Sequence, residues 1–126
     1  HVDEIRPRSS AHQVLVEVFN PGQAEDTLVE ALSWLMARTR AQPGLLRCRT
    51  AAELLGRGRV LVLTEWDSVE ALESYLSSDS FARVLSLAEL GTRAPEVRIH
   101  RLSEPKGLDY VASIRNHEGL FPGGDE

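Results

Sequence analysis

The chain has 126 residues, 42% of them hydrophobic and 26% charged, and a formal net charge of −5. This size and composition fit one globular domain with its own hydrophobic core. The acidic balance argues against a nucleic-acid or anionic-membrane surface, and no apolar run approaches the roughly 20 residues that span a bilayer.

A single cysteine, Cys48, cannot form a disulfide within the chain, which favours a reducing compartment, the cytoplasm. As a thiol within a predicted strand, it fits the role of a small hydrophobe better than that of a nucleophile. No signal-peptide pattern follows the first residue. The histidines lack the spacing of metal ligands, so the sequence predicts no metal site; they are His1, His12, His100 and His117.

The sequence pattern of the N-terminal third of the chain predicts an arm, a strand and a helix. Residues 1–12 are polar and predict a flexible arm. Apolar residues then recur at helical spacing from about Ala24 to Arg40, which predicts an amphipathic helix ended by Pro43 and Gly44. Between arm and helix, valines alternate with other residues at the period of a strand, at Val14, Val16 and Val18.

Two strands joined by a hairpin follow. The first spans about Leu45 to Ala52, and Gly56 to Gly58 marks the turn. The second, Arg59 to Trp66, is apolar almost throughout, which indicates burial on both faces. The side chains expected to share a face are, in the first strand, Leu46, Cys48 and Thr50; in the second, Val60, Val62 and Trp66; and opposite these, Leu61 and Leu63.

A helix in two pieces comes next. Asp67 and Glu70 have the spacing of a capping box for the first piece, and Asp79 is expected to cap the second, which Gly91 ends. The inner stripe of the first piece is expected to consist of Val69, Leu72 and Leu76.

A last strand is predicted from Glu96 to Leu102, with His100 on the face opposite Val97 and Ile99. The chain thus divides into the arm, a domain over residues 13–102, and a C-terminal extension over residues 103–126. Within the extension, Leu108 to Ile114 is apolar enough for a possible edge strand, and the residues after it have the composition of a flexible tail.

The predicted order of elements, βαββαβ, is the ferredoxin-like α+β pattern, a four-stranded antiparallel sheet with both helices on one face. One chain leaves the second face of the sheet bare, although Leu61 and Leu63 make it apolar. A second sheet is needed to cover that face, so the sequence predicts a homodimer.

The central segment resembles the antibiotic biosynthesis monooxygenase-like (ABM) domains, which are dimeric α+β barrels. The resemblance covers about Gln13 to Leu102. It implies an oxygenase without metal or flavin that oxidises electron-rich polycyclic phenols through the substrate's own reactivity with O₂, in a cavity between sheet and helices. Three motifs carry it: Gln42 to Leu45, Thr64 to Ser68 with Ala71 and Leu72, and Ser78 to Phe81.

The match to the polyketide-oxidising branch of that family is partial. Its third-strand tryptophan corresponds to Trp66. Its asparagine, tyrosine and arginine correspond to Val62, Leu72 and Ser86. The haem-degrading branch needs a histidine ligand where Leu85 stands, so the sequence argues against a haem-degrading enzyme. Two further residues of that branch, a tryptophan and an asparagine, are replaced by Tyr75 and Leu15.

Two residues are candidates for catalysis. The indole N–H of Trp66 can donate to a substrate oxygen, and His100, inside a strand, can act as a general base. The alternatives are a core aromatic residue and a hydrogen-bonded structural histidine. The predicted lining of the pocket consists of Tyr75, Phe81, Val62 and Leu72.

Two functions stay open. One is a cofactor-independent monooxygenase of a quinol or an aromatic polyketide-like substrate. The other is a non-catalytic dimeric module that binds a small hydrophobic aromatic ligand. The polar groups of the pocket distinguish the two, because an oxygenase needs a base to form the phenolate and a donor for the developing oxyanion.

Overall fold

The computed structural model describes residues 11–55 and 58–117. Its strands are β1 (Ala11–Val18), β2 (Leu45–Ala52), β3 (Val60–Trp66) and β4 (Glu96–Leu102). They form one antiparallel sheet in the order β2-β3-β1-β4. The predicted ferredoxin-like α+β fold is therefore confirmed.

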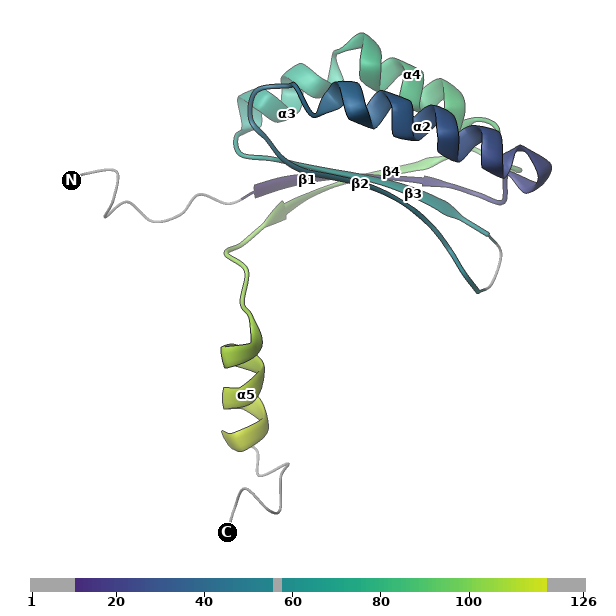
Figure 1. The fold of residues 1–126 in the computed structure, drawn as a ribbon. Helices are drawn as coiled ribbons and strands as arrows, with labels where there is room; N and C mark the ends of the chain where they lie inside the picture. The colour runs from purple at the N-terminus through teal and green to yellow at the C-terminus, as the bar shows by residue number, and fades with distance from the viewer. Residues whose placement is uncertain (1–10, 56–57, 118–126) are drawn as a thin grey trace.

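Helices cover one face of this sheet and leave the other bare (Figure 1). The helices are η1 (Gly22–Ala24, 3₁₀), α2 (Glu25–Thr39), α3 (Val69–Leu76), α4 (Asp79–Ala88) and α5 (Leu108–His117). Of these, α2, α3 and α4 pack on the sheet, and no helix of the described residues is long and apolar enough to cross a membrane. The predicted helix over residues 24–40 is confirmed as α2.

The core lies between the sheet and these three helices. Strand pairing places Val16 opposite Val62 and Val14 opposite Thr64, so their side chains point to the same, helix-covered face. The opposite face carries Leu15, Leu61 and Leu63, all half-buried. The largest fully buried side chains are Trp66, Tyr75, Leu28, Leu32, Val14, Val16, Val18, Val60, Val62, Val84, Thr39 and Thr64.

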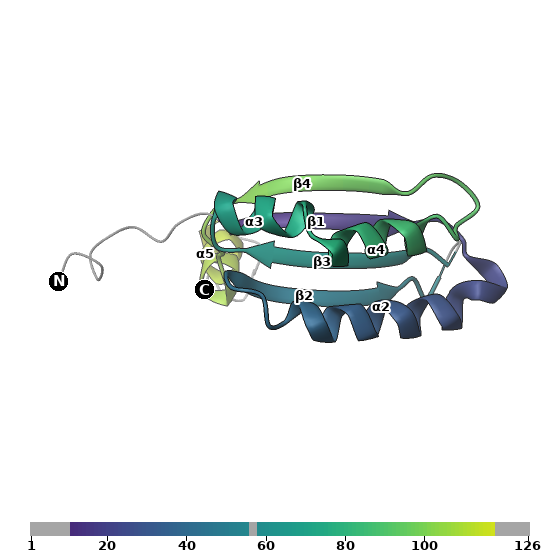
Figure 2. The ribbon, with the colours of Figure 1, turned by 90° about the horizontal axis from the view of Figure 1, so that it is seen from above.

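The edge strand β4 is poorly covered. Its pairing with β1 places Val97 and Ile99 on the helix side of the sheet, yet they are 41% and 49% exposed. From above, α3 and α4 run along β1 and β3 and leave β4 outside them (Figure 2). An apolar strip on the helix side of β4 thus remains open.

The caps of the helices differ from the sequence prediction by one residue. Ser68 Oγ accepts a hydrogen bond from Ala71 N–H at 3.1 Å, and Ser78 Oγ accepts from Phe81 N–H at 3.2 Å. Asp67 lies one residue before the cap, and its backbone N–H donates to the Gly44 carbonyl at 2.8 Å. Asp79 is the first residue of α4, where its charge favours the positive end of the helix dipole.

Two burial predictions were wrong. Val69 is 44% exposed, and Tyr75, at 2%, takes its place on the inner side of α3. In β2, Leu46 is 58% exposed although Cys48 is buried. A register shift between Leu45 and Arg47 breaks the alternation and turns Leu46 away from the core.

The C-terminal extension corrects another prediction. Leu108 to Ile114 is not an edge strand but most of helix α5, whose described side chains are all exposed. The predicted arm is shorter than expected, because residues 11 and 12 already belong to β1. Residues 1–10 of that arm, the turn residues 56 and 57 and the predicted tail beyond residue 117 lie outside the described residues.

Candidate functional site

Three aromatic rings pack in a row between β3 and the helices. Trp66 closes β3, Tyr75 comes from α3, and Phe81 from the first turn of α4. The rings of Trp66 and Tyr75 stack with centroids 4.8 Å apart, and Phe81 meets Tyr75 edge-on at 5.0 Å. The structure thus brings together these three predicted site residues, and Val62 and Leu72 belong to the same buried cluster.

Thr64, which the sequence analysis missed, holds the polar atoms of this cluster. The indole Nε1–H of Trp66 donates to Thr64 Oγ1 at 2.9 Å, so the proposed donor already has an acceptor. Burial raises the pKa of Tyr75 to about 12, against a hydrogen bond with Thr64 that lowers it. Tyr75 is therefore a neutral hydroxyl at physiological pH.

The two catalytic candidates lie on opposite faces of the sheet. His100 pairs with Gln13 on the bare face, whereas Trp66 pairs with His12 on the helix-covered face. His100 is exposed and no helix of the described residues packs over it. Within one chain the sheet separates the two candidates, so they cannot act on one substrate atom together.

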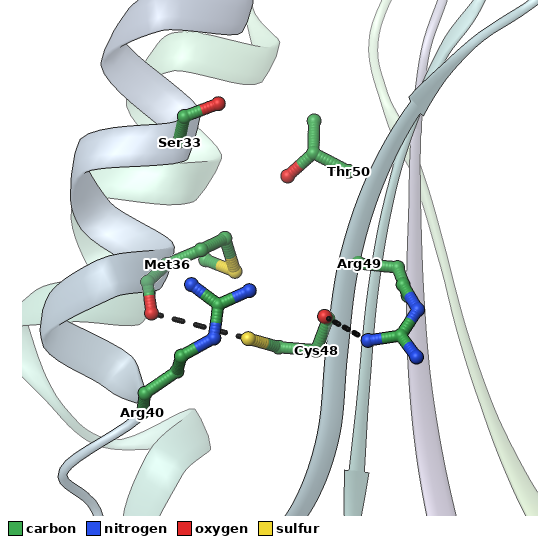
Figure 3. A pocket seen from close by; sticks show the side chains of 6 residues that line it. All are labelled: Ser33, Met36, Arg40, Cys48, Arg49 and Thr50. Atoms are coloured by element: carbon green, nitrogen blue, oxygen red, sulfur yellow. Dashed lines mark hydrogen bonds between the residues drawn. The ribbon is translucent and has the colours of Figure 1, made fainter.

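A cavity of about 270 Å³ lies beside this cluster, between α2 and the edge strand β2 (Figure 3). The side chain of Arg49 points away from it across the strand, and Arg49 donates to the Cys48 carbonyl at 3.1 Å. The cavity opens to solvent past the exposed Ser33 and Arg40. Its lining consists of Ser33, Met36 and Arg40 from the helix side and Cys48, Arg49 and Thr50 from the strand.

Two polar groups of this cavity lack a partner within the described residues. Arg40 caps the C-terminal end of α2, and its guanidinium extends between helix and strand. No carboxylate of the described chain pairs with it. Thr50 Oγ1 is buried without a hydrogen-bond partner. Since buried polar atoms normally have partners, Thr50 Oγ1 is suited to bind an oxygen atom of a ligand, and the exposed Arg40 adds a positive charge at the cavity mouth.

Cys48 separates the cavity from the aromatic cluster. It is 3% exposed, and its thiol donates a weak hydrogen bond to the Met36 carbonyl at 3.9 Å. On the neighbouring strand β3, Thr64 pairs with Cys48. These contacts fit a small buried hydrophobe. Among the described residues, no group of three or more His, Cys, Asp or Glu side chains could hold a metal ion.

The sequence itself matches one family model. Residues 12–86 match the model described as antibiotic biosynthesis monooxygenase. The matched range includes the aromatic cluster and the cavity but not His100 or α5. A search of curated proteins found no match.

Solved structures share the fold. A conserved protein from Methanosarcina mazei Go1 superposes with a TM-score of 0.68 at 20% identity, covering 76% of this chain and 96% of that one. A candidate antibiotic biosynthesis monooxygenase from Caulobacter crescentus CB15 gives 0.61 at 20% identity, with 82% and 100% covered. Another from Deinococcus radiodurans gives 0.68 at 16%, with 77% and 97% covered. At such identities the likeness concerns the fold alone.

Proposed function

Because the chain belongs to the antibiotic biosynthesis monooxygenase family, we propose that it is a monooxygenase that acts without metal, haem or flavin on a quinol or related phenol. The single observation that carries this proposal is a cavity that holds the guanidinium of Arg40 and the hydroxyl of Thr50, neither of which has a partner among the described residues. A purely apolar cavity would favour binding without chemistry.

Arg40 supports the formation of a phenolate. A guanidinium beside a phenol favours the charged form and lowers the phenol's pKa. The cavity opens to solvent, so a water molecule can take the proton and no protein base is needed. Tyr75, neutral up to about pH 12, is unsuited to be that base. Thr50 and Ser33 then supply hydroxyl donors for the oxygen atoms of the substrate.

The phenolate supplies the electrons for the reaction with O₂. In the keto tautomer of the substrate, a ring CH₂ becomes C=O, one oxygen atom enters that carbonyl, and the other leaves as water. All four electrons come from the substrate, so no external reductant is required. A cavity of about 270 Å³ is below the usual range of roughly 300–1,000 Å³ for ligand pockets, which favours one or two rings over a larger polyketide.

In this proposal the aromatic cluster lies behind Cys48, which separates it from the cavity. Trp66 serves as a polar anchor only if Cys48 moves aside and a substrate oxygen replaces Thr64 as the acceptor of its N–H. Tyr75 and Phe81 supply apolar ring surface, with Val62 and Leu72 behind them. His100 can contribute only if a second copy brings it near a substrate, because it faces the other side of the sheet.

We also propose that two copies pack through the bare faces of their sheets, in the cytoplasm, where Cys48 stays reduced. The leucines of that face are one support. A second is that its two central carboxylates are already paired, Glu17 with Arg59 and Glu65 with Arg47. Paired carboxylates can be covered at a lower desolvation cost than isolated ones.

One observation favours a second candidate, a non-catalytic dimeric module that binds a small aromatic ligand. The N–H of Trp66 already has an acceptor in Thr64, and apart from the buried thiol of Cys48 no titratable base among the described residues lines the cavity. In that case a phenol would bind near Arg40 and leave unchanged.

Oxygen uptake separates these functions. We expect the protein to consume O₂ with dihydroxynaphthalenes, which have two rings, with or without a metal chelator. Arg40→Met should lower kcat/KM by about tenfold or more, since electrostatic stabilisation of an oxyanion is lost. Arg38→Met is the matched control, because the Arg38 guanidinium lies over the Trp34 ring, 5.4 Å from its centroid.

Trp66→Phe should also lower turnover, with the exposed Trp34→Phe as its control. Full turnover in Arg40→Met or in Trp66→Phe would disprove the role given to that residue. Saturable binding of the same phenols without any oxygen uptake would favour the binding module.

A further inference from the structure

Helix α5 exposes an apolar surface that no other described part of the chain covers. It follows β4 after the five linker residues 103–107 and makes no extensive contact with any other described element. Its apolar side chains are all exposed: Leu108 at 83%, Tyr110 at 48%, Val111 at 47% and Ile114 at 39%. A helix of 10 residues is marginal alone in water, where isolated helices need about 12–15 residues, so α5 needs a packing partner.

The position of α5 restricts which surface can supply that partner. It projects away from the sheet on the side opposite α2, α3 and α4 (Figure 1). The leucines Leu15, Leu61 and Leu63 lie on that same side. The other uncovered apolar strip, Val97 and Ile99 of β4, lies on the helix side of the same sheet. From its observed position, α5 cannot cover the strip of its own chain.

We infer that α5 is an arm exchanged between two copies of this chain, with its apolar side packed on the Val97–Ile99 strip of the second copy. The inference rests on the sheet-to-sheet dimer proposed above. Facing sheets pack about 10 Å apart, whereas a 10-residue helix is about 15 Å long. An arm that projects from the bare face therefore passes the second sheet and reaches its helix side.

The exchange joins two surfaces that are each open in one chain. Beside the exposed valine and isoleucine of β4 there is room, since α3 and α4 lie over β1 and β3 (Figure 2). In a dimer with two-fold symmetry, the arm of each copy would bury the Val97–Ile99 strip of the other copy. The arm thus adds apolar burial to a dimer whose sheet faces also carry charged side chains such as Arg47 and Glu65.

Sedimentation equilibrium of the full chain and of a chain ending at Ser103 tests the arm. We expect both to fold with the same melting temperature at low concentration, because α5 lies outside the core. The shorter chain should dimerise at least about tenfold more weakly, a loss of about 1.4 kcal/mol. Equal dimerisation constants would overturn the exchange while leaving the sheet dimer intact; two monomeric chains would overturn both.

A cross-link identifies the surface that α5 contacts. A benzophenone side chain in place of Val111 should link two chains on irradiation, with the attachment on β4 of the second copy. Attachment within one chain, attachment elsewhere on the second copy, or no cross-linked dimer would each overturn the inference. In the full chain, Ile114→Asp should weaken the dimer and Asn116→Asp, on the polar side of the same helix, should not. Oxygen uptake is measured separately, so its failure would not bear on this result.

Discussion

Thr64 connects the two aromatic residues that the sequence singled out. It accepts from the indole of Trp66 and bonds to the hydroxyl of Tyr75, at a position buried to 1% exposure. The signal for it was present in the chain, as the single polar residue in the buried alternation Val60, Val62, Thr64, Trp66. A lone hydroxyl in such a row requires a buried polar partner.

Tyr75 predicts a pH dependence of stability. Its pKa is about 12 in the folded protein and about 10 in the unfolded chain. Because the folded state holds the proton more tightly, the stabilising contribution is complete below pH 10 and is lost as pH rises to 12. The loss is about 2–3 kcal/mol, at 1.36 kcal/mol per pKa unit.

Urea unfolding at pH 9 and pH 12 measures this effect. The fall in the free energy of unfolding should be smaller in Tyr75→Phe than in the unmodified chain. Tyr110→Phe, which removes an exposed tyrosine, is the control and should leave the fall unchanged. If Tyr75→Phe loses as much stability with pH as the unmodified chain, then Tyr75 does not titrate as described.

At the scale of elements, Gly44 joins the loop before β2 to the turn before α3. Its φ is +86°, a value that strongly favours glycine, and an added Cβ would lie 2.5 Å from the Ala71 Cβ and 2.8 Å from Asp67 Oδ1. Its carbonyl accepts from the Asp67 N–H. This contact fixes where β3 ends and where α3 begins.

Gly44→Ala should destabilise the fold by about 2–5 kcal/mol, the sum of backbone strain and overpacking. Gly22→Ala is the matched control, since Gly22 also has a positive φ, +63°, but nothing lies within 4 Å of its added Cβ. The control should cost about 1–2 kcal/mol. Equal losses in the two variants, measured by chemical denaturation, would show that the contact with Ala71 has no energetic effect.

The sequence predicted the strands and helices of the domain but not their local detail. Asp67 and Ser68 are both residue types that cap helices well, and the structure places the cap at Ser68 while the Asp67 N–H donates to the Gly44 carbonyl. The irregularity after Leu45 shows no glycine or proline signal inside β2. In α5, the spacing of Leu108, Val111 and Ile114 also suited a helix, and a strand there would have needed a neighbour to pair with.

The cavity could not be predicted from the sequence, for a different reason. Arg40 and Thr50 come from two elements whose sides meet only when α2 packs on β2. Sequence patterns mark an arginine at a helix end and a threonine in a strand as ordinary surface residues. Only the packing shows that neither has a partner in the described chain. Trp66, by contrast, could be singled out from the sequence because its family motif is local; it does not line this cavity, and its contact with a substrate stays a prediction.

At the scale of the whole molecule, the dimer is the main prediction. Sedimentation should show a dimer at micromolar concentration, and the melting temperature should rise with protein concentration. Leu63→Arg, on the bare face, should abolish that rise because a charge would be buried between the sheets. Val69→Arg places the same charge on exposed α3 and should behave as the unmodified chain. A folded monomer at these concentrations would rule out the proposed assembly.

The open edge of β4 has a consequence for how the protein behaves in concentrated solution. An unpaired strand can template the addition of further chains and start fibres. This edge strand alternates its apolar residues Val97 and Ile99 with Glu96, Arg98 and His100, and Arg101 follows. An added identical strand would place some of these charges next to charges of the same sign. At 1 M salt the Debye length is about 3 Å, so this repulsion is largely screened. We therefore expect the protein to aggregate more readily in high salt than at physiological ionic strength.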